Sequence, residues 1–176
     1  MTLTATLIDS SAHLDLIRRT PRRLLWGVFA AYGLTALITA LVQSGGLAPN
    51  LRIGLLTLST LSGLLAGALV LGLYPLVFTF LSRKLGGVGE ESDVPQIRSV
   101  TALAMIPTLI TTLLAAVNGF GPITLLGGLL STVVFIYALS LANGTDMLAA
   151  MKHTFLIWGV LLGLLVLLNI VIKAGS

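Results

Sequence analysis

Side chains that could do acid–base, nucleophilic or metal chemistry are few in this sequence. The 176 residues include two histidines, six acidic residues and no cysteine. Asp146 and His153 are spaced so that a helix would place both on one face, with Lys152 nearby. They could form an acid–base or metal-binding pair, but two ligands make a poor metal site. We therefore expect a solvated pair at an interface with water.

Motifs for catalysis are also missing from the sequence. It contains no H-E-x-x-H motif and no Ser–His–Asp constellation. The absence of cysteine removes disulfides, thiolate nucleophiles and Cys-based metal sites together. We therefore expect a protein that is not an enzyme and that has no catalytic residues, metal site or bound cofactor.

The glycine-rich segment 86–89 raises the question of a phosphate-binding loop. Such a loop needs a strand before the glycines, and a lysine and a helix N-terminus after them. Here the glycines follow a long apolar stretch and precede Glu90, Glu91 and Asp93, whose carboxylates would repel phosphate. We expect these glycines to end a helix and let the chain turn. A nucleotide site is not predicted.

The placement of charge decides which elements carry these residues. Only 9% of the residues are charged, whereas soluble domains carry roughly a quarter. A soluble fold needs charge on its outward faces, and long stretches of this chain have none. A water-soluble domain and a disordered chain are therefore excluded. The stretches without Asp, Glu, Lys or Arg are residues 24–51, 53–82, 99–145 and 154–172.

Five membrane-spanning helices fit these stretches, because a span needs about 20 apolar residues. The stretch 99–145 is too long for one helix and breaks at Asn118–Pro122, which contains two glycines, an asparagine and a proline. The stretch 53–82 is one long span with Pro75 as its kink or exit point. The predicted fold class is an all-α, polytopic integral membrane protein with a five-helix transmembrane bundle in a single domain, residues 24–173. The predicted spans are residues 24–43, 53–81, 100–117, 123–141 and 154–172.

The orientation of the spans follows from the lysines and arginines. Eight of the ten basic residues fall on the side of the N-terminus, and only Arg52 and Lys173 fall on the other. Cytoplasmic loops carry such an excess of basic residues. We therefore expect a multi-pass protein of the cell membrane, with its N-terminus in the cytoplasm and its C-terminus outside.

Residues 1–23 form the predicted cytoplasmic segment, in which apolar residues are interspersed with Asp9, His13 and Asp15. This pattern predicts a short amphipathic helix on the inner membrane surface. Four arginines at its end would contact anionic headgroups of the inner leaflet, or alternatively only fix the orientation. They are Arg18, Arg19, Arg22 and Arg23.

Glycines supply part of the polarity inside the spans. No ionisable side chain is predicted within a span, which argues against a pump or a proton-coupled transporter. Gly63 and Gly67 in the second span, and Gly159 and Gly163 in the fifth, form small-xxx-small patterns that allow close helix approach. These faces serve packing within the monomer or, alternatively, a homo-oligomer.

Threonines next to a proline supply further polar groups inside the third span. Thr108, Thr111 and Thr112 lie beside Pro107 in the third span. We expect their hydroxyls to satisfy the carbonyl that the proline frees. The alternative is that these threonines, together with Pro75, line a cleft between the second and third spans.

Three short motifs accompany the five spans. A glycine-rich step follows the second span, a small-residue run ending in proline (Ala104–Pro107) lies in the third, and a short connector (Leu141–Asp146) precedes the last. From Asp15 to Ile172 the layout resembles the Yip family of Ypt/Rab-interacting membrane proteins, in particular its prokaryotic branch. The positions that match the family's motifs are Gly86, Gly87, Gly89, Pro107 and Gly144.

The resemblance implies a protein of the prokaryotic inner membrane, but it does not carry over the family's best-known partner. Eukaryotic members have Gly-Tyr before the proline, where this chain has Ala102-Leu103. They also have a long N-terminal extension linked to Rab binding, which is essentially absent before the first span here. Binding of a Rab-type GTPase is therefore not transferable.

Two functions remain open. We expect a Yip-like membrane protein that acts in membrane organisation or as a membrane-embedded interaction or scaffold protein. The alternative is a small transporter or lipid-handling protein that uses a cleft at the kinked second and third spans. The expected partners are membrane lipids, further copies of the chain or other membrane proteins. Nucleic acid is not expected, because topology accounts for the basic charge.

Overall fold

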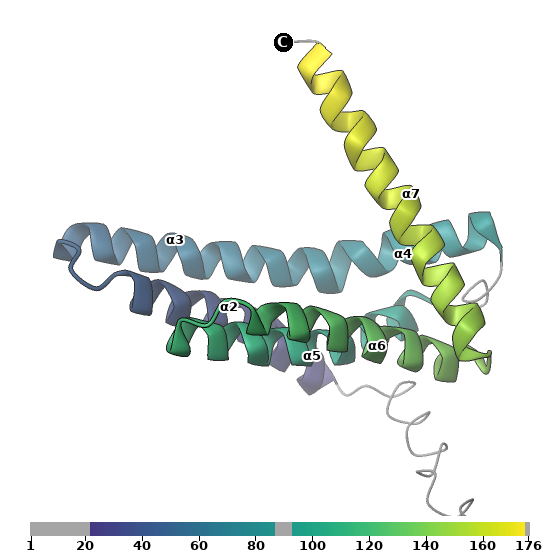
Figure 1. Cartoon of the computed structure of the whole chain (residues 1–176), viewed down its shortest axis with the longest axis horizontal. Helices are drawn as coiled ribbons and strands as arrows, with labels where there is room; N and C mark the ends of the chain where they lie inside the picture. The colour runs from purple at the N-terminus through teal and green to yellow at the C-terminus, as the bar shows by residue number, and fades with distance from the viewer. Residues whose placement is uncertain (1–21, 87–92, 175–176) are drawn as a thin grey trace, which may run out of the picture.

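The computed structural model describes residues 22–86 and 93–174, and every regular element among them is a helix (Figure 1). Five helices are long and apolar enough to cross a membrane, as the sequence predicts. The second of them runs without a break through α3 (Pro49–Ala68), the π-helix η2 (Leu69–Leu73) and α4 (Tyr74–Leu85). The others are α2 (Arg22–Gln43), α5 (Val94–Asn118), α6 (Ile123–Asn143) and α7 (Met147–Ala174).

Some predicted features fall outside the described residues. The amphipathic N-terminal helix, with Arg18 and Arg19, belongs to residues 1–21. Two of the motif glycines, Gly87 and Gly89, belong to residues 87–92. These features therefore stay predictions.

The helices extend beyond the predicted spans, because a helix can begin among polar residues if these cap its end. α5 begins at Val94, ahead of the predicted start at residue 100. The Asp93 carboxylate accepts a hydrogen bond from the Gln96 N–H at 2.9 Å and caps the helix, and Pro95 suits the first turn. α7 likewise begins at Met147, ahead of the predicted start at residue 154.

Glycines end three of the helices. Gly119, in the predicted break between the third and fourth spans, has a φ of +69° and ends α5. Gly144 has a φ of +60° and ends α6. This left-handed conformation favours glycine because it has no Cβ to clash with the backbone. Gly86, with a φ of +70°, ends α4.

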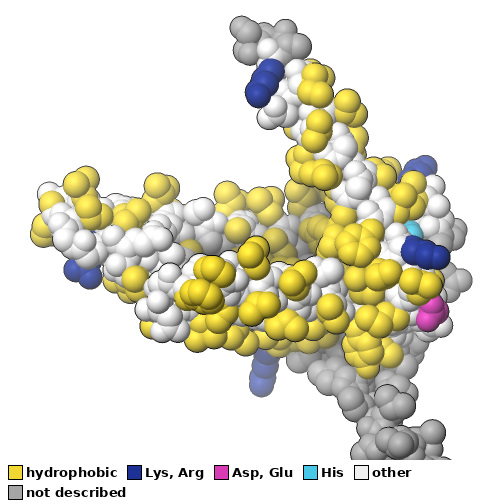
Figure 2. Space-filling view, viewed as in Figure 1, with side chains coloured by type: hydrophobic (Ala, Val, Ile, Leu, Met, Phe, Trp, Pro, Cys, Tyr) yellow, Lys and Arg dark blue, Asp and Glu magenta, His cyan; other side chains and the backbone are white. Residues whose placement is uncertain are grey.

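The helices α2, α3, α5 and α6 run side by side, whereas α7 leaves the bundle (Figure 1). The closest pairs are α2 with α3 and α5 with α6, each joined by a short turn. A fully buried core, which includes Phe78, Ile97, Leu139 and Ile157, lies where α4, α5, α6 and α7 meet. Apolar side chains cover much of the outer surface (Figure 2), as they do on helices that face lipid.

Pro75 interrupts the hydrogen bonding of the second span without ending the helix. Proline lacks an N–H, so the carbonyl four residues earlier, that of Leu71, loses its donor within the helix. The helix widens into η2 just before the proline. Arg98 of α5 supplies the missing donor, because its Nε donates to the Leu71 carbonyl oxygen at 2.8 Å. The expected kink is therefore a π-helical bulge that a neighbouring helix stabilises.

The threonines beside Pro107 bond differently from the expectation. The Thr111 hydroxyl donates to the carbonyls of Pro107 and Thr108, at 3.0 and 3.1 Å, and not to the Leu103 carbonyl that the proline frees. The Thr108 N–H donates to Ser131 Oγ on α6 at 3.2 Å, and the two hydroxyls lie 2.6 Å apart. The expectation that these hydroxyls satisfy the freed carbonyl is therefore wrong. Thr108 instead ties α5 to α6.

Candidate functional site

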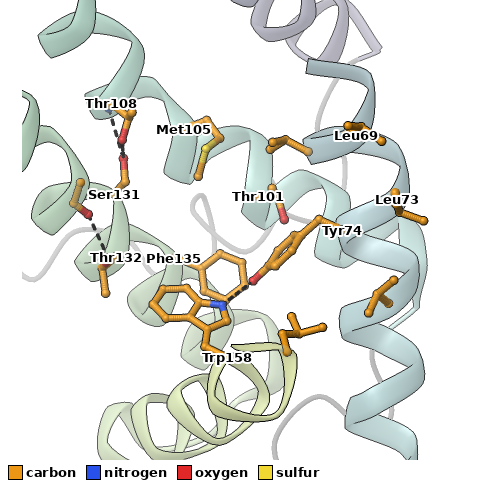
Figure 3. A pocket seen from close by; sticks show the side chains of 14 residues that line it. Leu69, Leu73, Tyr74, Thr101, Met105, Thr108, Ser131, Thr132, Phe135 and Trp158 are labelled. Atoms are coloured by element: carbon orange, nitrogen blue, oxygen red, sulfur yellow. Dashed lines mark hydrogen bonds between the residues drawn. The ribbon is translucent and has the colours of Figure 1, made fainter. Parts of the chain in front are cut away.

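A groove of about 600 Å³ opens between the second, third, fourth and fifth spans. Its walls come from η2, α4, α5, α6 and α7 (Figure 3). Most of the lining is apolar and includes Leu69 and Leu73 from the second span, Met105 from α5, Phe135 from α6 and Leu161 from α7. The groove therefore lies beside the π-helical bulge of the second span, where the sequence suggests a cleft.

Polar atoms that face the groove already have hydrogen-bond partners in the protein. The Trp158 Nε1–H donates to the Tyr74 hydroxyl at 2.9 Å (Figure 3). Thr108 and Ser131 bond to each other across α5 and α6, and the Thr132 hydroxyl donates to a carbonyl of its own helix at 3.0 Å. None of the described residues that line the groove is charged. Its chemistry suits an apolar chain better than an ion or a strongly polar solute.

Aromatic rings form one end of the groove and hold α7 against α4 and α6. The Phe135 ring centroid lies 5.4 Å from that of Phe78 and 6.0 Å from that of Tyr74. The Trp158 ring lies 6.1 Å from Phe135 on the same side. Such tilted and edge-to-face contacts are favourable beyond the area that they bury. This cluster of packed aromatic rings therefore closes one end of the groove.

His153 is buried next to the aromatic cluster. It is 6% exposed, its Nε2 lies 3.0 Å from the Ser82 hydroxyl, and its ring centroid lies 6.2 Å from that of Phe78. Asp146 is exposed, and its carboxylate accepts a hydrogen bond from the Leu148 N–H at 3.2 Å. The expectation of a solvated pair is therefore wrong for His153. Among residues 22–86 and 93–174, no group of three or more His, Cys, Asp or Glu could hold a metal.

The residues predicted to line a cleft do not all line the same one. Thr108 lines the groove. Thr112 lines a separate cavity of about 510 Å³ between α2, α3 and α5, which Thr108 also reaches. Thr111 is buried against α6, where Gly127 leaves room for its hydroxyl. Pro75 is buried, and residues on both sides of it line the groove.

The two small-xxx-small pairs have opposite surroundings. Gly63 and Gly67 are buried against α2. A Cβ built on Gly63 would lie 2.6 Å from the Tyr32 carbonyl oxygen, and one on Gly67 would lie 3.1 Å from the Tyr32 Cβ. Gly159 and Gly163 have no such heavy atom within 4 Å of a built Cβ. The first pair serves packing within the chain, and the second pair stands open.

Arg22 and Arg23 are neighbours in sequence but differ in surroundings. Both are exposed at the start of α2. Arg22 lines a cavity of about 540 Å³ together with Arg98. Arg23 is not part of that lining. Of the four arginines predicted to contact headgroups, Arg22 is thus placed at a concave surface.

No protein-family model, curated protein or solved structure matches this chain.

Sequence reasoning missed most of the side chains that shape the groove. Tyr74 and Trp158 carried a usable signal, because a buried Tyr or Trp usually finds a hydrogen-bond partner and the chain has only three tyrosines and two tryptophans. Ser131 carried none, since a serine in a helix commonly bonds to its own backbone. Phe135 is one of six phenylalanines in apolar stretches, and nothing in the sequence sets it apart.

Proposed function

We propose that this chain is a non-enzymatic integral membrane protein that acts in membrane organisation by associating with further copies of itself. The outer half of α7 is the observation that supports this most. Residues 162–172 are exposed, carry no charge and extend away from the bundle (Figure 1). Gly159 and Gly163 stand open just before and within this segment. Small residues at such places let two helices approach closely in a bilayer, where packing rather than hydrophobicity drives association.

Self-association can be tested in lipid nanodiscs or mild detergent. Replacing Gly159 and Gly163 by isoleucine should shift the protein toward monomer, because the side chains would hold a second helix away. Gly54→Ile is the matched control, since Gly54 also has open space around its Cβ but lies on α3. Cross-linking yield and light scattering measure the shift. Unchanged association in the double variant, or a native protein that is monomeric throughout, would contradict the proposal.

The proposal includes an orientation in the prokaryotic inner membrane, with the N-terminus in the cytoplasm. The excess of basic residues on the N-terminal side supports it. Since the chain has no cysteine, single cysteines report accessibility cleanly. An impermeant maleimide added to intact cells should label Gly45→Cys, in the turn between α2 and α3, and leave Gly89→Cys unlabelled. The reverse pattern would overturn the orientation.

A Yip-like assignment is part of the same proposal. It is supported by the positions of Gly86 and Gly144, which end α4 and α6, and of Pro107 within α5. Membrane lipids and further copies are the partners proposed on this basis, and Rab-type GTPase binding is not included.

The groove supports a second candidate, a lipid-handling function. Its size of about 600 Å³, its apolar lining and its opening to the outside of the bundle suit an acyl chain. Proteoliposomes with fluorescent phospholipids measure movement between leaflets. Gly128→Trp should slow that movement, because Gly128 lines the groove and has open space around its Cβ. Gly54→Trp is the control. If the native protein moves no lipid, this candidate fails.

A further inference from the structure

A cavity of about 540 Å³ lies where α2 begins. Three parts of the chain line it. The first two turns of α2 contribute Arg22, Leu25, Trp26 and Phe29. The second span contributes Ala68, Leu71 and Gly72, and α5 contributes Arg98. Two arginines on different helices, Arg22 and Arg98, therefore line one concave surface.

Arg98 is held in place by the main chain of the second span. Its Nε donates to the Leu71 carbonyl oxygen at 2.8 Å, which lacks a helical donor because Pro75 follows four residues later. Arginine has five N–H donors in a planar fork, so this bond fixes the group and leaves its terminal N–H groups to donate elsewhere. Arg98 is half-buried, and burial strengthens whatever charge pairing it makes.

The described part of the chain offers no carboxylate to neutralise this site. It contains two carboxylates, those of Asp93 and Asp146, and both accept hydrogen bonds from nearby backbone N–H groups. Within residues 22–86 and 93–174, neither forms an ion pair with Arg22 or Arg98. Among the described residues, the lining of the cavity is therefore positively charged and suits an anion.

The rest of the cavity is apolar. Leu25, Phe29 and Leu71 line it, and so does Trp26, which is 68% exposed. The Trp26 and Phe29 rings are in edge-to-face contact, 5.8 Å between centroids. Tryptophan and arginine together are typical of the headgroup level of a bilayer. A ligand that fits both parts carries an anionic group and a hydrocarbon chain.

We propose that this cavity is a binding site for an anionic phospholipid, whose phosphate is held between Arg22 and Arg98 and whose acyl chain lies over Leu25 and Phe29. Guanidinium groups match phosphate oxygens in charge and geometry. The site deepens the headgroup contact proposed for Arg22 and rests on the membrane location. It is independent of self-association through α7.

Quenching of Trp26 by brominated lipid tests the site. The protein is reconstituted in phosphatidylcholine with increasing fractions of brominated phosphatidylglycerol, and W26F measures the background from Trp158. R22Q and R98Q should each weaken the preference for phosphatidylglycerol about tenfold or more, as expected for the loss of one charge-assisted hydrogen bond. R23Q is the matched control. It also removes one positive charge, but Arg23, the neighbour of Arg22 in sequence, does not line the cavity. Its preference should change less than about twofold.

The outcomes separate the site from general attraction. Equal losses in R22Q, R23Q and R98Q would mean that charge alone draws the lipid, and would overturn the proposal. An unchanged preference for phosphatidylglycerol in R22Q would also overturn the proposal. Arg22 is exposed, so its substitution should not disturb the fold. R98K keeps the positive charge but loses the guanidinium group that donates to the Leu71 carbonyl. The preference of R98K for phosphatidylglycerol should therefore fall nearly as far as that of R98Q.

Relief of quenching by millimolar inorganic phosphate would identify free phosphate as the ligand and overturn the lipid assignment. Unchanged self-association in R22Q and R98Q keeps this test apart from that of α7.

Discussion

Gly63 and Gly67 on α3 have the same spacing as Gly159 and Gly163 on α7, yet the two pairs are used in opposite ways. The first pair lies against the backbone and ring of Tyr32, and the second meets nothing within 4 Å of a built Cβ. A spacing of four positions places both glycines on one helix face in either case. The spacing therefore shows that a helix can be approached closely, and not which surface approaches it.

The connections between helices explain the difference. α2 and α3 are joined by the short turn at residues 44–48, so they pack as antiparallel neighbours and the glycines of α3 face α2. α7 also follows a short turn, but the contacts of its first half with α4 and α6 set its direction. Ala150, Thr154 and Ile157 are completely buried there, whereas residues 162–172 are all exposed in the part of the chain that the structure describes. One helix thus contains both kinds of surface.

A large side chain at Gly63 should have the largest effect. Gly63→Ile would place atoms against the Tyr32 carbonyl oxygen and the Ala36 Cβ, each 2.6 Å from a built Cβ, and neither can move without separating α2 from α3. We expect a loss of about 3 kcal/mol or more in the free energy of unfolding, measured by denaturant titration in micelles. Gly54→Ile on the same helix is the control and should change little, since its Cβ would meet open space. Equal losses in both variants would mean that the contact with α2 is not responsible, since isoleucine itself favours a helix over glycine.

The two halves of α7 allow the next comparison. Ile157→Ala should lower the free energy of unfolding by about 2–4 kcal/mol, because Ile157 is fully buried and its removal leaves a cavity. Leu165→Ala removes a similar volume from a side chain that is 63% exposed, and should change it by less than about 0.5 kcal/mol. The same titration measures both. A large loss in dilute, monomeric Leu165→Ala would show that the outer half packs against its own bundle.

The sequence was enough to predict the five apolar helices, because each depends on a long stretch without charge. It also indicated the break at Asn118–Pro122, where Gly119 adopts a positive φ. It could not indicate that His153 is buried, since its partner Ser82 lies on another span. Nor could it indicate the role of Arg98, whose acceptor on Leu71 exists only because of Pro75. Such features depend on helix register in three dimensions, which apolar stretches do not encode in any visible pattern.

Gly67→Ala should have a smaller effect than Gly63→Ile at the same packed glycine pair. A Cβ there would lie 3.1 and 3.2 Å from Tyr32 Cβ and Cγ and 3.3 Å from the Phe29 ring, so both side chains must shift slightly. The helix gains from replacing glycine, and the two effects partly cancel. We expect a net loss of about 1 kcal/mol in the free energy of unfolding. If Tyr32→Ala is introduced as well, the loss due to alanine at residue 67 should become smaller, because the Tyr32 ring is removed while its Cβ remains. An unchanged loss would mean that the Tyr32 ring does not cause the crowding.

The smallest effect is expected at the open pair. Gly159→Ala and Gly163→Ala add a methyl group where no neighbouring atom lies within 4 Å, and alanine favours the helix over glycine. The monomer should therefore be unchanged or more stable by about 0.5 kcal/mol for each substitution. Titration at high dilution in detergent isolates the monomer, while Gly63→Ala measured in parallel should be destabilised, because its Cβ cannot avoid the Tyr32 carbonyl. A loss at residue 159 or 163 comparable to that at residue 63 would mean that α7 folds back onto its own bundle in the membrane. The same spacing would then have the same use in both helices, and self-association would lose the surface on which it depends.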